Sequence, residues 1–506
     1  MHPTPVNSPS DGRSGIPAIQ RSKTIDLAVI GSGFGGLGAA LRAQEIGKRP
    51  QLFEALNYPG GCASTFRHRG HSFEAGATLF SGFDSDQPFG RWIDERGLDV
   101  QIDPIDPLVE LRRPSGSLLV SRDREEFVER LCMWVGERPQ ALRAFLAYQK
   151  DIADVLWGLF ADPLLLPPLG FRSFGIHLRR SPRYLRLLRL VGRPLEGVLA
   201  RFGLHDCPAL RTYLDALCQI TVQSNAAEAE APFALAAMDY FWRGSGHVRG
   251  GIGRLAWALL ESLQERGADV RMSDRVHALE PSPQGWTLTS RSGKHGAPAV
   301  IANMLPQDLA RLGALDSPRL DRMTARVKSG WGACMLYRVV SPPPTAPAGA
   351  MHLELVQDES APFIEGNHLF VSIGEGSAEN PSGERSMTVS THVPLAKWRA
   401  LPEAALVEAV ERTQGRMRHG LAQLAPEWEA VKFETSASPR TFQRFTRRSE
   451  GLVGGIPRQA GLRQYLDAFR GPVAPGLALV GDSVFPGQST LATALGGHRA
   501  VDRLFR

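Results

Sequence analysis

The sequence predicts an α/β fold built around a Rossmann-like dinucleotide-binding domain whose parts lie far apart in the chain. A short apolar run at 25–30 is followed by a glycine-rich turn at 31–36, an Ala- and Leu-rich helix over 37–47 and a second strand over 49–54. This succession is a β-α-β unit of about 30 residues, the usual size. A strand, a turn and a helix follow one another again near the other end of the chain, at 477–480, 481–483 and 490–504.

The composition is that of a globular protein. Of 506 residues, 43% are hydrophobic and 22% are charged, which excludes a fibrous or largely disordered chain. Five cysteines, at 62, 132, 207, 218 and 334, are too few for a disulfide scaffold and lack zinc spacing. Residues 1–23 are polar and predict a disordered tail, without the apolar run of a secretory signal. No apolar window is long enough to predict a spanning helix.

The glycine-rich turn has the spacing of a dinucleotide-binding motif, G-x-G-x-x-G. Gly31 permits the tight turn from strand to helix, Gly33 lets a diphosphate approach the backbone, and Gly36 lets the helix pack closely on the strand. The helix N-terminus offers free N–H groups and partial positive charge to the phosphates. Glu54 ends the second strand, 23 residues after Gly31, where its carboxylate can accept hydrogen bonds from a ribose. We therefore predict a dinucleotide site, with NADP disfavoured.

Two further turns favour a flavin dinucleotide over a nicotinamide one. Gly60 and Gly61 follow the second strand directly, and a flavin dinucleotide, being longer, must be threaded past more backbone. Asp482 follows Gly481 and the C-terminal strand, so its carboxylate would lie at the carboxyl edge of the sheet, within reach of ribityl hydroxyls. The final helix would point its N-terminus inward and stabilise negative charge on a reduced flavin. The predicted cofactor is therefore FAD.

With these motifs in place, the chain resembles the FAD-dependent carotenoid isomerase and phytoene desaturase family, within the amine-oxidase-like flavoprotein superfamily. The matching stretches are AVIGSGFGGLGAAL (28–41), FEALNYPGGCASTF (53–66), RGHSFEAGATLF (69–80), GGIGRLAWAL (250–259) with RVHALEP (275–281), and LVGDSVFPGQSTLATALGGHRAV (479–501). They occur in the order of the family and span almost the whole chain after the tail.

The resemblance implies a role for each matching residue. The glycines of the first turn would hold the diphosphate, Glu54 the ribose, Val276 the adenine and Asp482 the ribityl chain. Gly61 and Cys62 would line the phosphate or flavin path, and Thr78, Leu79 and residues 490–492 would lie near the ring. The residues predicted to bind FAD are Gly31, Ser32, Gly33, Phe34, Gly35, Gly36, Glu54, Gly61, Cys62, Thr78, Leu79, Val276, Gly481, Asp482, Thr490, Leu491 and Ala492.

One position departs from the pattern of the family. Desaturases and amine oxidases of the superfamily often carry Arg directly after the glycine pair, whereas this chain has Cys62; carotene isomerases resemble it more, with a small residue there. The stretch 439–445, whose residues 441–445 predict a short strand-like piece, and the run 454–457 also look isomerase-like. The resemblance favours an isomerase or saturase over a desaturase, with Cys62 as a small spacer rather than a reactive thiol.

A second glycine group, Gly251-Ile252-Gly253 with Asp274 downstream, has the spacing of another dinucleotide motif. The six residues before it, 245–250, contain two glycines and no apolar run, so no strand is predicted there and the group is interpreted as a helix start. His68 and His71 form H-x-x-H without a third ligand nearby, so no metal site is predicted.

The net charge of +6 is concentrated in one Leu-rich segment. Residues 172–201 contain eight arginines and one acid, so the rest of the chain is close to neutral and no nucleic-acid partner is predicted. Around Arg183, Arg186 and Arg189 the pattern gives one apolar and one cationic face. Such a helix is typical of one that lies on an anionic membrane surface; a bundle helix with a solvated basic face is the alternative. The predicted location is cytoplasmic, with peripheral contact to the inner face of a membrane.

The predicted organisation is an FAD domain from 24–82, 246–310 and 470–506, with an α+β substrate domain and a helical membrane-facing segment inserted at 83–245 and 311–469. The predicted function is an FAD-dependent oxidoreductase acting on a long apolar polyene: a carotenoid-type isomerase, desaturase or saturase. The alternatives are an amine-oxidase-like oxidase of a small molecule, a polyene reductase of a secondary-metabolite pathway, and a flavin-free scaffold. No catalytic side chain or oligomeric state can be named from the sequence.

Overall fold

The computed structural model describes residues 25–76, 78–313, 317–375 and 383–506, so the predicted tail lies outside the described part. Its organising element is a five-stranded parallel sheet. In spatial order the strands are β19 (Leu477–Val480), β13 (Val300–Asn303), β1 (Leu27–Ile30), β2 (Pro50–Phe53) and β9 (Asp269–Arg271). The first four are buried along almost their whole length, as expected of parallel strands covered on both faces.

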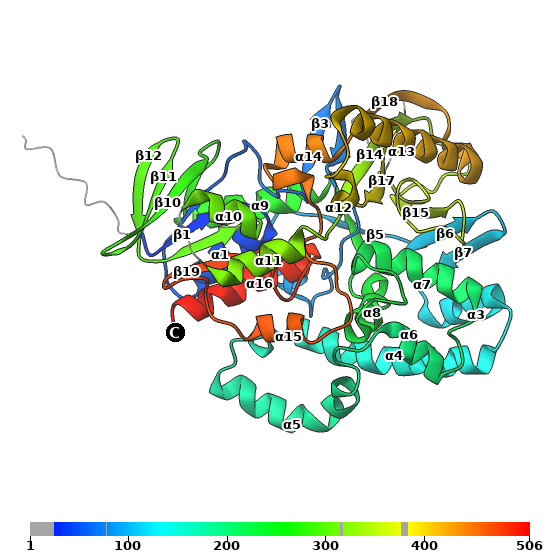
Figure 1. The fold of residues 1–506 in the computed structure, drawn as a ribbon, viewed down its shortest axis with the longest axis horizontal. Helices are drawn as coiled ribbons and strands as arrows, with labels where there is room; N and C mark the ends of the chain where they lie inside the picture. Colours follow the sequence, from blue (N-terminus) through cyan, green and yellow to red (C-terminus); the bar gives the residue numbers. More distant parts are fainter. Residues whose placement is uncertain (1–24, 77, 314–316, 376–382) are drawn as a thin grey trace, which may run out of the picture.

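The first and last helices pack directly against each other (Figure 1). A Cβ added at Gly38 of α1 (Phe34–Glu45) would lie 2.1 Å from the Ala494 carbonyl oxygen, and one added at Gly497 of α16 (Thr490–Leu504) would lie 1.8 Å from the Gly35 carbonyl oxygen. Only glycine permits backbones this close. Because β1 and β19 run parallel, both helices begin at the carboxyl edge of the sheet, where α/β folds bind ligands.

A larger sheet of seven strands forms the opposite half of the molecule (Figure 1). Its order is β18 (Val431–Ala437), β14 (Gly332–Val340), β17 (Arg385–Val393), β16 (His368–Ile373), β15 (Met351–Val356), β6 (Val109–Arg113) and β7 (Gly116–Val120). Helix α13 (Glu403–Leu424) contributes Met417 and Leu421 to the core of this sheet.

A helical layer completes that half, with its own apolar core. Its helices are α3 (Arg124–Val135), α4 (Pro139–Phe160), α5 (Phe171–Leu188), α6 (Leu195–Arg201), α7 (Pro208–Thr221) and α8 (Ala231–Ala237). The smaller elements are β3 (Thr65–His68), β4 (His71–Glu74), α2 (Pro88–Arg96), β5 (Ile102–Pro104), the sheet of β10 (Val276–Ser282), β11 (Gly285–Ser290) and β12 (Gly293–Ala297), α10 (Pro306–Leu312), α11 (Pro318–Val327), α12 (Leu395–Trp398) and α15 (Arg463–Ala468).

The strand-like piece predicted at 441–445 is wrong, because these residues lie in a helix, α14 (Pro439–Thr446). The helix begins with Ser438 as its N-cap and Pro439 in its first turn, and the Thr441 hydroxyl accepts a hydrogen bond from the Ser438 backbone N–H at 3.1 Å. Proline in the first helical turn is favoured because its missing N–H would be unpaired there. Phe442 is the buried residue of the piece, while Phe445 is exposed.

The prediction that no strand precedes the second glycine group is also wrong, since β8 (Gly246–Val248) lies there. This strand pairs antiparallel with β5 and stays outside the five-stranded sheet. The helix that follows, α9 (Ile252–Glu265), has its first amides occupied by protein: Ile252 N–H donates to Glu74 at 2.9 Å and Gly253 N–H donates to Thr65 at 2.9 Å. The glycine group is therefore a helix start packed on the β3–β4 hairpin.

Candidate cofactor and substrate site

One cavity of about 950 Å³ runs from the carboxyl edge of the five-stranded sheet into the space beside the seven-stranded sheet. Of the residues predicted to bind FAD, only Ser32 and Gly36 lie outside its lining. Gly36 is behind the cleft, where a Cβ would meet the Gly31 carbonyl oxygen at 1.9 Å. The predicted residues on the cavity wall are Gly31, Gly33, Phe34, Gly35, Glu54, Gly61, Cys62, Thr78, Leu79, Val276, Gly481, Asp482, Thr490, Leu491 and Ala492.

The glycine cradle surrounds a side chain that sequence reasoning missed, Asn303 at the end of β13. A Cβ at Gly33 would lie 2.7 Å from the Asn303 amide nitrogen, and one at Gly35 would lie 2.7 Å from the Asn303 amide oxygen. Gly31 has a φ of +95°, a conformation that favours glycine. These glycines therefore make room both for a ligand on the cavity side and for an amide that can hydrogen-bond to it.

Glu54 is held rigidly at the end of β2 by three donors. Its Oε2 accepts the Ser32 backbone N–H at 2.8 Å and the Ser32 hydroxyl at 2.6 Å, while its Oε1 accepts the Leu56 N–H at 2.8 Å. The side chain lies on the cavity wall near Val276, which begins β10. Ser32 thus fixes the carboxylate instead of facing the cavity itself.

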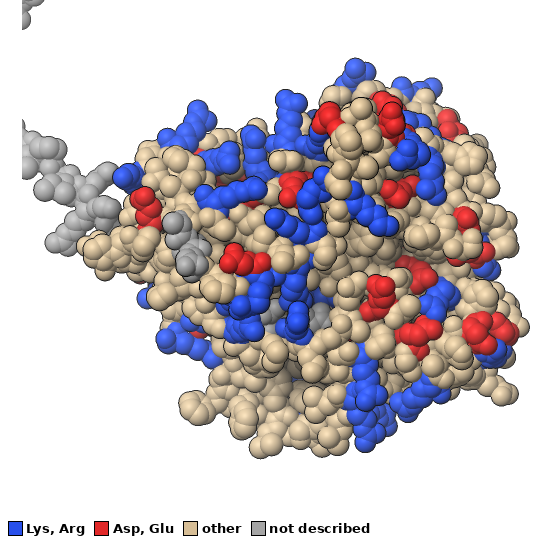
Figure 2. Space-filling model, viewed as in Figure 1, with Lys and Arg blue, Asp and Glu red and all other residues tan. Residues whose placement is uncertain are grey.

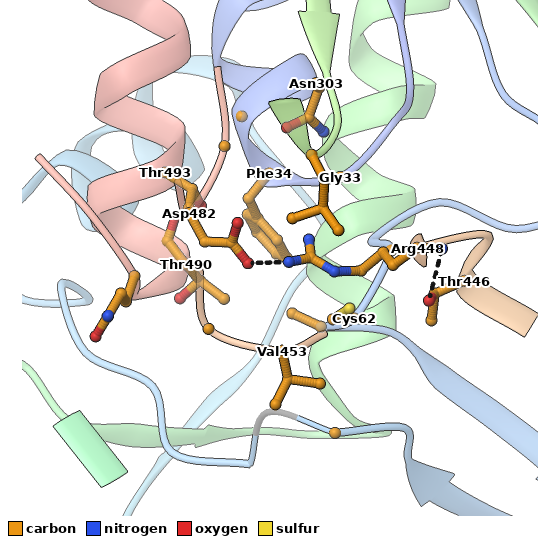
Figure 3. Close-up of a pocket in the computed structure, with 18 of the residues that line it drawn as sticks. Gly33, Phe34, Cys62, Asn303, Thr446, Arg448, Val453, Asp482, Thr490 and Thr493 are labelled. Atoms are coloured by element: carbon orange, nitrogen blue, oxygen red, sulfur yellow. Dashed lines mark hydrogen bonds and ion pairs between the residues drawn. The ribbon is translucent and has the colours of Figure 1, made fainter. Parts of the chain in front are cut away.

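Between the two glycine turns the cleft holds an ion pair (Figure 3). Arg448 Nη2 donates to Asp482 Oδ2 at 2.7 Å, and the Cys62 thiol lies beside the guanidinium. Burial raises the pKa of Cys62, so the thiol stays protonated and a nucleophilic role is disfavoured. Burial opposes the charge of Arg448, but Asp482 and Cys62 outweigh it and raise the pKa of the arginine.

Three residues that line the cavity carry buried polar atoms with no partner among the described residues, two of them at the N-terminus of α16 and the third, Gln223, just after α7. These atoms are Thr490 Oγ1, Gln488 Oε1 and Gln223 Oε1. Buried polar groups in native proteins are nearly always paired. Unpaired groups on the wall of a cavity indicate a polar ligand at this position.

A large part of the remaining cavity wall is apolar, although charged side chains also line the cavity: Arg275, Asp308, Arg311, Arg440, Arg444, Arg447 and Arg458. Burial raises the pKa of Tyr240 to about 12 and lowers the pKa of His392 to about 4, so both are neutral near pH 7. The apolar lining residues are Leu79, Trp157, Phe160, Ile220, Val222, Phe233, Ala236, Ala237, Ala333, Met335, Phe370, Phe442 and Val453.

No cluster of three or more His, Cys, Asp or Glu side chains with the geometry of a metal site occurs in the described ranges. His68 and His71 pair across the β3–β4 hairpin. No described helix is both long and apolar enough to cross a bilayer.

The comparisons with known proteins agree with this geometry. Residues 29–96 match the model of an NAD(P)-binding Rossmann-like domain. The chain is 24% identical over 508 residues to the chloroplastic prolycopene isomerase of Arabidopsis thaliana, covering 95% of this chain and 82% of the relative. It is 39% identical over 116 residues, 22% of each chain, to a neurosporene-forming phytoene desaturase of Cereibacter sphaeroides. Wild-type putrescine oxidase bound to putrescine superposes with a TM-score of 0.63 at 16% identity, covering 95% and 99% of the two chains.

The chain thus has a Rossmann-like dinucleotide-binding domain within a fold similar to that of putrescine oxidase. The resemblance drawn from its motifs, to the FAD-dependent carotenoid isomerase and phytoene desaturase family, is confirmed by the similarity to the two relatives above.

FAD, the cofactor of this family, fits the residues present. Glu54, Val276, Gly31 and Gly33 line the same cavity. The buried hydroxyl of Thr490, also on its wall, has no hydrogen-bond partner among the described residues.

Proposed function

We propose that this chain is an FAD-dependent oxidoreductase whose substrate is a long apolar polyene, with carotenoid-type isomerisation, desaturation or saturation as the reaction. The observation that carries the proposal is a cavity in which the glycine cradle and a wall rich in apolar side chains share one space. The relatives named for prolycopene and phytoene act on molecules of the kind that such a wall would accept.

FAD, when bound, supplies the chemistry by exchanging a hydride or an electron pair at its N5 atom with the substrate. The chain supplies binding and orientation. The N-terminus of α1 faces the diphosphate and the N-terminus of α16 offers partial positive charge where a reduced flavin is negative. Tyr240 and His392 are neutral near pH 7, so neither adds a charge to the apolar part of the wall.

The decisive experiment is anaerobic incubation of the FAD-loaded protein with cis and trans carotenes, with and without a reductant, followed by chromatography. An isomerase converts one geometric isomer to another only with reduced flavin and without net redox change. A desaturase lengthens the conjugated system with oxidised flavin and leaves it reduced. FAD-loaded protein that alters no carotene under either condition would overturn the proposal.

The small-amine alternative is not favoured by the site. The cavity wall contains no lysine among its described residues, whereas an aromatic cage with a lysine beside the flavin would support amine oxidation. The likeness to putrescine oxidase is a likeness of fold. A polyene reductase differs from the proposed enzyme only in its electron supply, and the arm with added reductant detects it as loss of conjugation.

We propose further that α5 lies on a membrane surface and gives an apolar substrate access to the protein. The helix lies at the lower edge of the molecule (Figure 1), where Figure 2 shows mostly uncharged residues. Phe171, Phe174, Leu178, Leu185 and Leu188 are all exposed along it, from 61% to 100%, at the spacing of one helix face.

Basic side chains border this apolar face. Arg183 and Arg189 are exposed, and Arg186 is exposed while paired with Asp151 at 3.0 Å. An apolar face edged by arginine binds best to bilayers that contain anionic lipid.

Flotation with liposomes tests this placement. The wild type should float with vesicles of anionic phospholipid at low salt, and the triple change of Arg183, Arg186 and Arg189 to Gln should reduce the floated fraction. Arg130→Gln on α3, an arginine outside the segment, is the matched control. Equal flotation of the triple variant and the wild type, or no binding by the wild type, would refute the membrane placement.

A further inference from the structure

The cleft contains a cation that no dinucleotide motif supplies. Arg448 follows α14 and lines the same cavity as Gly33, Cys62 and Asp482, with a side chain only 17% exposed. The preceding residue, Arg447, ends the helix in the left-handed conformation, with a φ of 60°. This turn sends the side chain of Arg448 into the cleft instead of out to solvent (Figure 3).

Two hydrogen bonds orient the guanidinium and leave part of it available. Its Nε donates to the Leu452 carbonyl oxygen at 2.7 Å, and its Nη2 donates to Asp482 Oδ2 at 2.7 Å. In the described part of the chain, no acceptor for Nη1 is found. Because a guanidinium carries five N–H donors in a rigid fork, it can hold Asp482 and a second anionic partner together.

The guanidinium lies at the first turn of α1. A Cβ added at Gly35 would be 3.3 Å from the Gly481 amide nitrogen, so Asp482, the next residue, is adjacent to that turn. Figure 3 shows the guanidinium between Asp482 and Cys62, facing Gly33. Gly61 is close as well, since a Cβ there would lie 3.6 Å from the Gly33 Cα. The free edge of Arg448 is thus directed at the place where the glycine cradle would receive a diphosphate.

The diphosphate needs more positive charge at the glycine cradle than the residues of the glycine turns supply. A dinucleotide diphosphate carries two negative charges, whereas a helix N-terminus supplies about half a positive charge. Cys62 is neutral, and the Glu54 and Asp482 carboxylates add negative charge nearby. Arg440, which lines the same cavity, is exposed and paired with Glu403.

We propose that Arg448 is the cationic ligand of the FAD diphosphate, reaching it from a segment outside the dinucleotide motifs, and that the small residue Cys62 leaves the room for its guanidinium. This inference rests on the assignment of FAD as the cofactor. It makes Arg448 a binding residue that balances the charge of the diphosphate, with the hydrogen bond to the Leu452 carbonyl oxygen keeping its side chain oriented.

The test uses deflavinated full-length protein and two probes, adenosine and ADP, which differ by the diphosphate. Arg448→Met should weaken the binding of ADP and of FAD about 10- to 100-fold, the range for losing a charge-assisted hydrogen bond, and leave adenosine binding unchanged. Adding Cys62→Arg to Arg448→Met should restore part of the ADP affinity, because position 62 adjoins the same space. Arg399→Met is the matched control: this arginine pairs with Glu450 outside the cavity lining, and the variant should bind ADP as the wild type does.

Asp482→Asn separates ligand binding from a merely structural role. If Arg448 only anchors the Asp482 turn, this change should weaken ADP as much as Arg448→Met does. Under our proposal the ADP affinity of Asp482→Asn is unchanged or higher, since Arg448 is released from its ion pair. This variant distinguishes the two roles of Arg448 even if Arg448→Met does not fold. If a folded Arg448→Met variant binds ADP as tightly as the wild type does, the inference is overturned while FAD stays the cofactor. If the wild type binds neither FAD nor ADP, the cofactor assignment itself is overturned.

Discussion

Replacement of Glu54 by Gln isolates the part of FAD binding that depends on the ribose. Glu54 accepts two hydrogen bonds from Ser32 and one from Leu56. In Glu54→Gln the amide oxygen can still face Ser32, which leaves an NH₂ group opposed to the Leu56 N–H and takes the negative charge away from the ribose hydroxyls. Loss of one hydrogen bond to a charged acceptor costs about 1.5–3 kcal/mol, so the Kd for FAD should rise by about 10- to 150-fold.

The assay is a titration of deflavinated protein with FAD, followed by quenching of flavin fluorescence. Ser32→Ala is the matched control: it removes the 2.6 Å hydroxyl bond to Glu54 but leaves the carboxylate on the cavity wall. We expect it to cost stability of about 1 kcal/mol and to change the Kd for FAD far less. A Glu54→Gln variant that binds FAD with the wild-type Kd would refute the reasoning and remove Glu54 from the ribose site.

Two further predictions concern the scaffold. Gly497→Ala places a Cβ 1.8 Å from the Gly35 carbonyl oxygen, so we expect a fall in Tm together with weaker FAD binding as α1 and α16 separate. The control is Gly415→Ala on α13, where a Cβ meets nothing within 4 Å and Tm should be unchanged or higher. Equal Tm values for the two variants would contradict this account. Burial raises the pKa of Glu230 from 4.5 to about 7. Because the unfolded chain ionises first, the stability due to this group is complete below about pH 4.5 and is lost as the pH rises through 7. Denaturant unfolding across this range should show a shallower pH dependence in Glu230→Gln, and identical slopes would exclude Glu230 as the cause.

The parts of the site that follow from sequence are those where backbone geometry dictates residue type. Gly31 needs a positive φ, and Gly36 lies against a carbonyl oxygen, so no other residue serves. The C-terminal helix was predicted at 490–504, and α16 spans those residues because Ser489 caps it, its hydroxyl accepting the Ala492 N–H at 3.0 Å.

Other features depend on contacts between segments that no local pattern records. Strand β8 has two polar or glycine residues among three and exists because it pairs with β5, far earlier in the chain. Asn303 reaches the cradle only because β13 lies beside β1 in the sheet. Arg448 carries no motif spacing at all, and its position depends on the left-handed Arg447.

The error at 441–445 had a signal that could have prevented it. Ser438 and Pro439 form a helix start, and Phe442 and Phe445 are three residues apart, which is a helical spacing. The β-propensity of the two phenylalanines does not outweigh the helix start at Ser438 and Pro439.

The central claim is that the amino end of the chain cradles the diphosphate of FAD in a cleft completed by its carboxyl end. The most direct measurement is the flavin content of the purified wild type and of Gly33→Val after reconstitution with excess FAD and gel filtration. We predict that the wild type retains FAD with a shifted visible spectrum and that Gly33→Val elutes without it, because the added side chain would meet Asn303 and fill the cradle. Equal retention by both proteins, or a colourless wild type, would contradict the account.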